Sequence, residues 1–121
     1  MGVRKVLIIE DNYLIAAQLA AAMEDDGFKV VGPVDTATSA VCRIDDEALD
    51  GALLDVRLRE GSAVDVASAL RAHHVPFVIV SGYSHDTLPT ELKHEPYVGK
   101  PMGHSALIEI VRDTFKASPQ H

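Results

Sequence analysis

Apolar residues along this chain follow two alternating patterns, which are short unbroken runs and longer stretches with helical spacing. The short runs are rich in branched apolar residues, and they occupy residues 5–9, 29–34, 51–56, 76–81 and 97–99. Runs of this kind, without polar alternation, are typical of strands buried on both faces of a parallel sheet. The second run contains Gly32-Pro33, which favours a place at the edge of the sheet.

The longer stretches predict helices between the strands. The first is predicted over residues 12–23, where Ile15, Leu19 and Met23 repeat at helical spacing, and Gly27 is expected to end it.

Side chains that favour helix starts predict the next two helices. Asp35 is placed to cap a helix over residues 36–44. Ser62 and Asp65 form a pair that resembles a capping box in front of the third helix. The last helix is predicted over residues 105–115.

Residues 82–95 have only weak helical character, and Pro89 interrupts it. With few apolar anchors, this segment is expected to be the most mobile internal part of the chain. The remaining pattern is five β-α units with short connections. It predicts an α/β fold, a flavodoxin-like doubly wound five-stranded parallel sheet with strand order 2-1-3-4-5. Helices would cover both faces, and the fourth helix would be short or irregular.

Length, charge and cysteine content narrow the class of protein. The 121 residues are enough for a single domain, residues 1–121, of which 116–121 are expected to fray. The net charge of −7 and the lack of a basic run argue against nucleic acid as a partner. Cys42 is the single cysteine and the apolar runs are too short to span a membrane, so we expect a cytoplasmic protein.

Polar side chains gather where the predicted strands end. Glu10 and Asp11 follow the first strand, Asp55 ends the third, Ser81 the fourth and Lys100 the fifth. In the order 2-1-3-4-5 the first and third strands are neighbours, so their three acids should converge. At an effective dielectric of about 20, each close pair of acids costs roughly 4 kcal/mol. A proton, the Lys100 amine or a cation would relieve this repulsion, and an all-oxygen site on a partly open rim suits Mg²⁺.

The motifs IIEDN, LLDV, VSGY and VGKP stand at these strand ends, and they follow one another in order along the chain. With them the chain resembles, from Val6 to about Phe115, the receiver domain of two-component response regulators (CheY-like). The resemblance implies that Asp55 accepts a phosphoryl group from a histidine kinase or phosphotransfer protein. It further implies that Mg²⁺ binds to Glu10, Asp11, Asp55 and the Arg57 carbonyl. Ser81 and Lys100 would bind the phosphoryl group, and Ser81 and Tyr97 would form the switch. The Lys100–Pro101 peptide bond would be cis.

The chain departs from the common family pattern on both sides of the site. The loop VRLREGS after Asp55 is short and has no proline, and Gly82-Tyr83 follows Ser81. Together with the reduced fourth helix, these features resemble a subset of receivers that is common in alphaproteobacteria. Arg57 and Tyr83 flank the site, so we expect both to modulate it and Tyr83 to shield the phosphoryl group from water.

Simpler structural interpretations exist for the same residues. Glu10 and Asp11 are also suited to cap the first helix, since acids there favour the helix dipole. Ser81 could bond only to backbone, and Tyr97 could serve only in packing.

The function favoured by the sequence is a stand-alone phosphoacceptor switch that signals by protein contacts with an unknown target, as a monomer or weak dimer. It would not be an enzyme, apart from self-phosphorylation and slow dephosphorylation. The alternatives are a phosphate sink or shuttle, a receiver fragment of a larger protein, a binding module without phosphorylation, and a phosphohydrolase with an aspartyl nucleophile. Such hydrolases need an acid two residues after the nucleophile, where this chain has Arg57.

Overall fold

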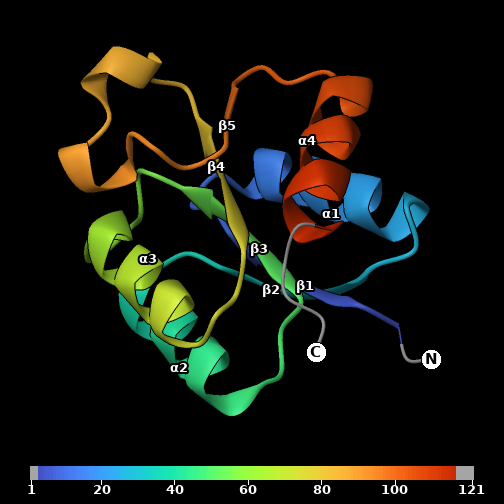
Figure 1. The fold of residues 1–121 in the computed structure, drawn as a ribbon, viewed down its shortest axis with the longest axis horizontal. Coiled ribbons are helices and arrows are strands. Elements are labelled where there is room, and N and C mark those ends of the chain that lie inside the picture. Colours follow the sequence, from blue (N-terminus) through green and yellow to red (C-terminus); the bar gives the residue numbers. More distant parts are fainter. Residues whose placement is uncertain (1–2, 117–121) are drawn as a thin grey trace.

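The computed structural model describes residues 3–116, in which strands and helices alternate along the chain (Figure 1). The strands are β1 (Lys5–Ile9), β2 (Lys29–Val34), β3 (Gly51–Asp55), β4 (Phe77–Ser81) and β5 (Tyr97–Gly99). The α-helices are α1 (Tyr13–Asp25), α2 (Ala37–Asp46), α3 (Ala63–Ala72) and α4 (His104–Lys116). Two short 3-10 turns, η1 (His85–Thr87) and η2 (Thr90–Leu92), lie between β4 and β5.

The strands form one parallel sheet with the order β2-β1-β3-β4-β5, which confirms the predicted topology. In this register Ile9 lies beside Leu54, and Asp55 lies beside Val80. The carboxyl ends of β1 and β3 are therefore adjacent at the point where the strand order reverses. This is where open parallel sheets place their sites.

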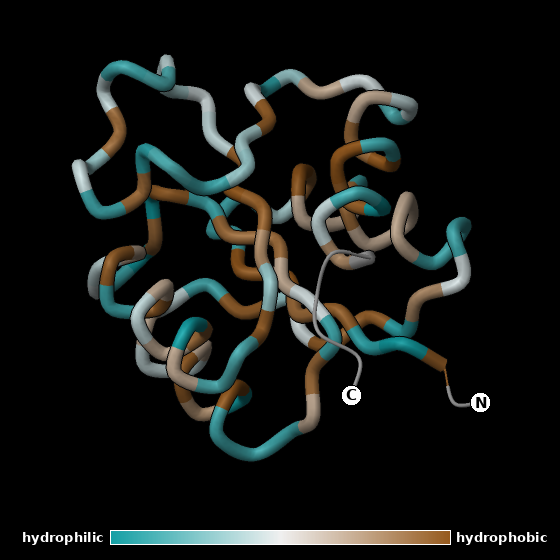
Figure 2. Tube along the Cα trace, viewed as in Figure 1, coloured by the Kyte–Doolittle hydropathy of each residue, from teal (hydrophilic) through white to brown (hydrophobic). Residues whose placement is uncertain are grey.

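Helices cover both faces of the sheet, with α2 and α3 on one face and α1 and α4 on the other (Figure 1). Leu7 and Leu54 face the α2–α3 side, whereas Ile8 and Leu53 face the α1–α4 side. Figure 2 shows the hydrophobic residues concentrated along the strands at the centre of the molecule. Both faces of the central strands are buried, which explains their unbroken apolar runs.

The starts of α2 and α3 show which side chains cap them. Thr36 caps α2, and its Oγ1 accepts a hydrogen bond from the Ser39 N–H at 3.1 Å. The prediction that Asp35 caps this helix is wrong, because the helix begins one residue later than expected. Ser62 caps α3 as predicted, and its Oγ accepts from the Val64 N–H at 3.1 Å.

The segment between β4 and β5 forms the two 3-10 turns in place of an α-helix, which confirms the expected short or irregular element. Leu88 and Leu92 are nevertheless buried beside α3. Arg71 of α3 donates hydrogen bonds to the Glu91 carbonyl at 2.8 Å and to Glu95 Oε2 at 2.7 Å. The premise that this segment has few apolar anchors is therefore wrong, and its mobility stays a prediction.

The predicted fraying of residues 116–121 lies outside the described residues, except for Lys116, which ends α4. Between residues 3 and 116, none of the helices has the length and apolar character needed to cross a membrane.

Candidate functional site

Three carboxylates from the ends of β1 and β3 meet at the carboxyl edge of the sheet. One oxygen each from Glu10, Asp11 and Asp55 lies within 4.8 Å of the other two. Glu10 and Asp55 are buried, whereas Asp11 is exposed to solvent. The strand order thus brings together the acids that the sequence placed at neighbouring strand ends.

The turn after β1 holds these acids in place. The Glu10 N–H donates to the Val34 carbonyl at 2.9 Å, which ties the turn to β2. The Asn12 N–H donates to Glu10 Oε2 at 3.1 Å, and Asn12 Oδ1 accepts from the Ile15 N–H at 3.0 Å. Asn12 is therefore the N-cap of α1, so capping does not account for the acidic pair. Sequence reasoning missed this role, although an asparagine directly before a helical stretch is its usual signal.

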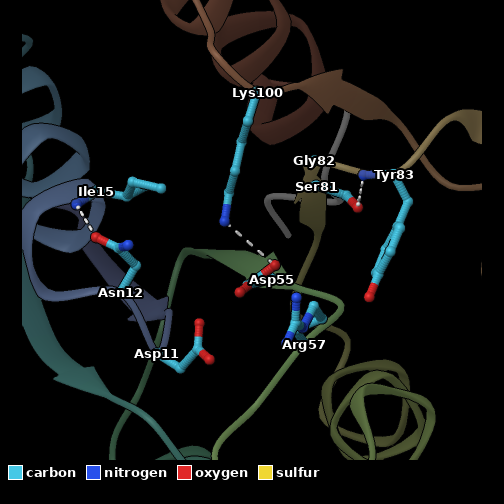
Figure 3. Close-up of a pocket in the computed structure, with 9 residues that line it drawn as sticks. All are labelled: Asp11, Asn12, Ile15, Asp55, Arg57, Ser81, Gly82, Tyr83 and Lys100. Carbon is cyan, nitrogen blue, oxygen red and sulfur yellow. Dashed lines mark hydrogen bonds and ion pairs between the residues drawn. The ribbon is translucent and has the colours of Figure 1, made fainter.

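Lys100 extends from the end of β5 toward the acids, as Figure 3 shows. Its Nζ lies 2.8 Å from Glu10 Oε1 and 3.4 Å from Asp55 Oδ1. The amine is thus shared by both buried carboxylates and is nearer to Glu10. The Lys100–Pro101 peptide bond is cis, as is Gly32–Pro33.

The electrostatics of the site centre on Asp55. Burial raises the pKa of the Asp55 carboxyl from 3.8 to about 7, and the hydrogen bond and negative charge of Glu10 act in the same direction. The Lys100 charge and the Arg57 backbone amide lower the pKa and only partly offset these effects. Near neutral pH the protein groups alone therefore leave Asp55 partly protonated, and added positive charge would favour the carboxylate.

A cavity of about 490 Å³ lies over Asp55 and opens to solvent (Figure 3). Asp11 and Arg57 lie near the Asp55 carboxylate in this view, and the Tyr83 ring extends along the same opening. The cavity therefore joins the acids to the predicted phosphoryl-binding residues. Its lining consists of Asp11, Asn12, Ile15, Asp55, Arg57, Ser81, Gly82, Tyr83 and Lys100.

Ser81 and Tyr97 are connected through the backbone of Tyr83. Ser81 Oγ accepts a hydrogen bond from the Tyr83 N–H at 3.0 Å, and the Tyr97 hydroxyl donates to the Tyr83 carbonyl. The half-buried Tyr97 ring also packs edge-on against His85, with 5.6 Å between ring centroids. The residue at 83 thus links the ends of β4 and β5, and the switch roles of Ser81 and Tyr97 stay predictions.

Comparison with known proteins places the chain in a family. Residues 6–112 match the family described as the response regulator receiver domain. The chain belongs to this family. The receiver domain is 28% identical to the transcriptional regulatory protein PdtaR of Mycobacterium tuberculosis over 112 residues, which are 89% of this chain and 55% of PdtaR. It is 32% identical to the sensory transduction protein RegX3 of the same species over 115 residues, 92% of this chain and 50% of RegX3. The chain therefore spans about half the length of these relatives.

Solved structures share the fold of this receiver domain. SdrG from Sphingomonas melonis Fr1 has a TM-score of 0.83 and 33% sequence identity, covering 97% of this chain and 100% of SdrG. The receiver domain of the sensor histidine kinase PA1611 from Pseudomonas aeruginosa has a TM-score of 0.80 and 21% identity, covering 96% of this chain and 100% of that domain. That crystal structure contains a magnesium ion coordinated in the active site cleft. At 21% identity this similarity concerns the fold alone.

The acids of this receiver domain have the chemistry of a magnesium site. Glu10 Oε1 is buried and has no hydrogen bond of regular geometry to any residue described, although the Lys100 amine is 2.8 Å away. Carboxylate oxygens are the ligands that Mg²⁺ prefers, and the exposed Asp11 leaves room for the several waters that the ion retains. The donor set of Glu10, Asp11 and Asp55 therefore fits Mg²⁺.

Proposed function

We propose that this receiver domain is a phosphoacceptor switch, in which Asp55 accepts a phosphoryl group from a phosphohistidine of a histidine kinase or phosphotransfer protein. The observation that carries the proposal is the position of Asp55, a buried carboxylate at an open cavity, within 3.4 Å of the Lys100 amine and beside two further acids. A receiver fragment of a longer protein would act by the same chemistry.

The transfer requires attack by a carboxylate oxygen of Asp55 on the phosphorus. The new P–O bond forms as the P–N bond of the phosphohistidine breaks, and the imidazole nitrogen keeps the electron pair and takes up a proton. Lys100 is close enough to Asp55 to pair with a phosphoryl oxygen. Ser81 lines the same cavity, and its hydroxyl would donate a hydrogen bond to the phosphoryl group. Bound by the three acids and the Arg57 carbonyl, Mg²⁺ would neutralise charge on the phosphoryl oxygens.

Acetyl phosphate with Mg²⁺ tests this chemistry without a partner protein. We expect the intact mass to rise by one phosphoryl group, and EDTA to prevent the gain because the uncompensated acids would repel the donor. No gain in mass with Mg²⁺ present would contradict the proposal. Multiple turnover of a small phosphate ester would instead support the phosphohydrolase, despite Arg57 at the position of the second acid.

We further propose that the output of the switch is a change in protein–protein contacts rather than catalysis. A phosphate sink would show the same uptake but no change in partner affinity upon phosphorylation, which separates these two functions. The cytoplasmic location, the monomeric or weakly dimeric state and the absence of enzymatic turnover stay predictions.

Tyr83 is expected to slow the hydrolysis of the phosphoaspartate. Tyr83 lines the cavity over Asp55 and is 43% exposed, which supports a role in limiting the access of water to the phosphoryl group. We expect Tyr83→Ala to shorten the lifetime of the phosphoaspartate by about two- to fivefold, which is up to about 1 kcal/mol of barrier. Tyr83→Phe keeps the ring and should behave like the wild type. Loss of the phosphoryl group can be followed by intact mass after removal of the donor, and equal lifetimes for all three proteins would show that the ring does not shield the site.

A further inference from the structure

The loop that follows Asp55 is fastened at its far end to the loop that precedes α2. The Arg59 N–H donates to the Asp35 carbonyl at 2.8 Å, and the Ala37 N–H donates to the Glu60 carbonyl at 2.9 Å. Thr36 and Glu60 form an isolated parallel bridge between the two loops at this point. The side chains of Arg59 and Asp35 also pair at 2.9 Å, although this pair is exposed and contributes little by itself.

The bridge depends on a glycine at position 61. Gly61 has a φ of +87°, a conformation that other residues rarely adopt. A Cβ atom at this position would lie 2.4 Å from the Cβ of Ala37, which is too close for two methyl groups. Because Ala37 is buried at the start of α2, a side chain at 61 would push the two loops apart.

The short segment from Asp55 to Glu60 is thus held at both ends. Asp55 is fixed in the sheet beside Val80, and Glu60 is fixed by the bridge. Arg57 lies between these two points and lines the cavity. Without the bridge, the loop would have to become ordered when its carbonyl binds an ion. The loss of backbone conformational entropy would cost about 1 kcal/mol or more for each residue.

We infer that the Gly61–Ala37 contact and its bridge position the Arg57 carbonyl as a ligand for Mg²⁺, which makes Gly61 a positioning residue of the site. This inference rests on the proposed function, since it concerns the ion that the phosphoryl transfer requires. Mg²⁺ demands nearly ideal octahedral geometry, so a displaced carbonyl weakens binding even when the acids are unchanged.

Gly61→Ala and Gly27→Ala make a matched pair for the test. Both glycines have positive φ, +87° and +92°, so both substitutions introduce backbone strain, and Gly61→Ala adds the close contact with Ala37. A Cβ at Gly27 would meet nothing within 4 Å, and this residue lies beyond the end of α1. We expect Gly61→Ala to raise the Kd for Mg²⁺ by about tenfold in a calorimetric titration, as is usual for lost support of a metal ligand, and Gly27→Ala to leave it unchanged.

A second substitution makes the result specific to the close contact. Ala37→Gly in the Gly61→Ala background removes the methyl group that the new side chain would strike, and it should restore most of the Mg²⁺ affinity. Backbone strain at position 61 would not be reversed in this way, because Ala37→Gly leaves the positive φ of residue 61 unchanged.

Ala37→Pro provides a variant that keeps the helix but breaks the bridge. Proline is favoured at the first helical position and lacks the N–H that binds the Glu60 carbonyl. Thr36 before it has φ −127° and ψ 156°, which suits a residue that precedes proline. We expect weaker Mg²⁺ binding, and this variant decides the question if Gly61→Ala does not fold.

The outcomes separate the two proposals. Unchanged Mg²⁺ affinity in Gly61→Ala, or in Ala37→Pro where the first does not fold, would overturn the positioning role while the wild type still binds Mg²⁺ and accepts phosphate. If the wild type itself binds no Mg²⁺ and gains no phosphoryl group from acetyl phosphate, the proposed function and this inference fall together.

Discussion

Replacing Asp55 with Asn is expected to abolish phosphoryl uptake and, in the presence of EDTA, to raise the free energy of unfolding by about 2 to 4 kcal/mol at about pH 8. Uptake is lost because an amide cannot serve as the nucleophile. Stability rises because the substitution removes a buried charge that lies beside the carboxylates of Glu10 and Asp11. The same residue would thus limit stability and carry the proposed function.

The free energy of unfolding of the wild type should fall as the pH rises, because Asp55 ionises less readily in the folded protein than in the unfolded protein. Asp55 titrates at about 7 in the folded protein and has a reference value of 3.8. At pH values below both, the group is protonated in the folded and unfolded states and does not affect the balance. As the pH rises from about 4 to about 7, the unfolded state releases the proton before the folded state, so the free energy of unfolding falls. Above pH 7 the loss is complete and approaches about 4 kcal/mol, at 1.36 kcal/mol for each pKa unit.

Urea unfolding with EDTA at about pH 4 and about pH 8 measures this effect. The free energy of unfolding of Asp55→Asn should exceed that of the wild type only slightly at the lower pH and by the largest amount at the higher pH. Asp113→Asn removes an exposed acid on α4 and should change stability by about 0.5 kcal/mol or less at either pH. Mg²⁺ should reduce the difference in unfolding free energy between the two proteins, because it stabilises the wild type. Equal stabilities of wild type and Asp55→Asn at the higher pH would show that neither burial nor the neighbouring acids make the Asp55 charge unfavourable.

The fold and most of the site can be predicted because they follow from burial and strand order. Strands covered on both faces must be apolar throughout, as Leu7, Ile8, Leu53 and Leu54 are, so their positions are visible in the sequence. Once the order 2-1-3-4-5 is inferred, the residues at the strand ends must share one edge of the sheet. No geometric detail is needed to place Asp55 beside the acids that follow β1.

The features that sequence reasoning missed are set by contacts between distant loops. Asp35 has good capping chemistry, but the helix begins one residue later, and Arg59 binds Asp35 instead. Leu92 was not expected to be an anchor because Pro89 interrupts helical spacing, yet the 3-10 turns still bury its side chain. The approach of Gly61 to Ala37 depends on the relative placement of two β-α loops, which no local pattern encodes.

Replacing Lys100 with Met is expected to affect stability and metal binding in opposite directions. Methionine keeps an apolar stem of similar length but removes the amine that lies 2.8 Å from Glu10 and 3.4 Å from Asp55. Breaking a buried ion pair in this way costs about 3 kcal/mol, so the free energy of unfolding with EDTA should fall by roughly that amount at about pH 8. Protonation of Asp55 then limits any further loss, because its pKa rises when the lysine charge is removed.

The affinity for Mg²⁺ should rise in Lys100→Met, because the amine and the ion compete for the same carboxylates. Two unit charges 4 Å apart interact by about 1 kcal/mol even in bulk water, and a divalent ion doubles this, so we expect a gain of about tenfold or more. Lys29→Met removes an exposed charge at the opposite end of the sheet and should leave the Mg²⁺ affinity unchanged. Calorimetric titration of the three proteins compares these affinities. Weaker Mg²⁺ binding by Lys100→Met would mean that the amine assembles the acids rather than competing for them, and the electrostatic account of the site would then be wrong.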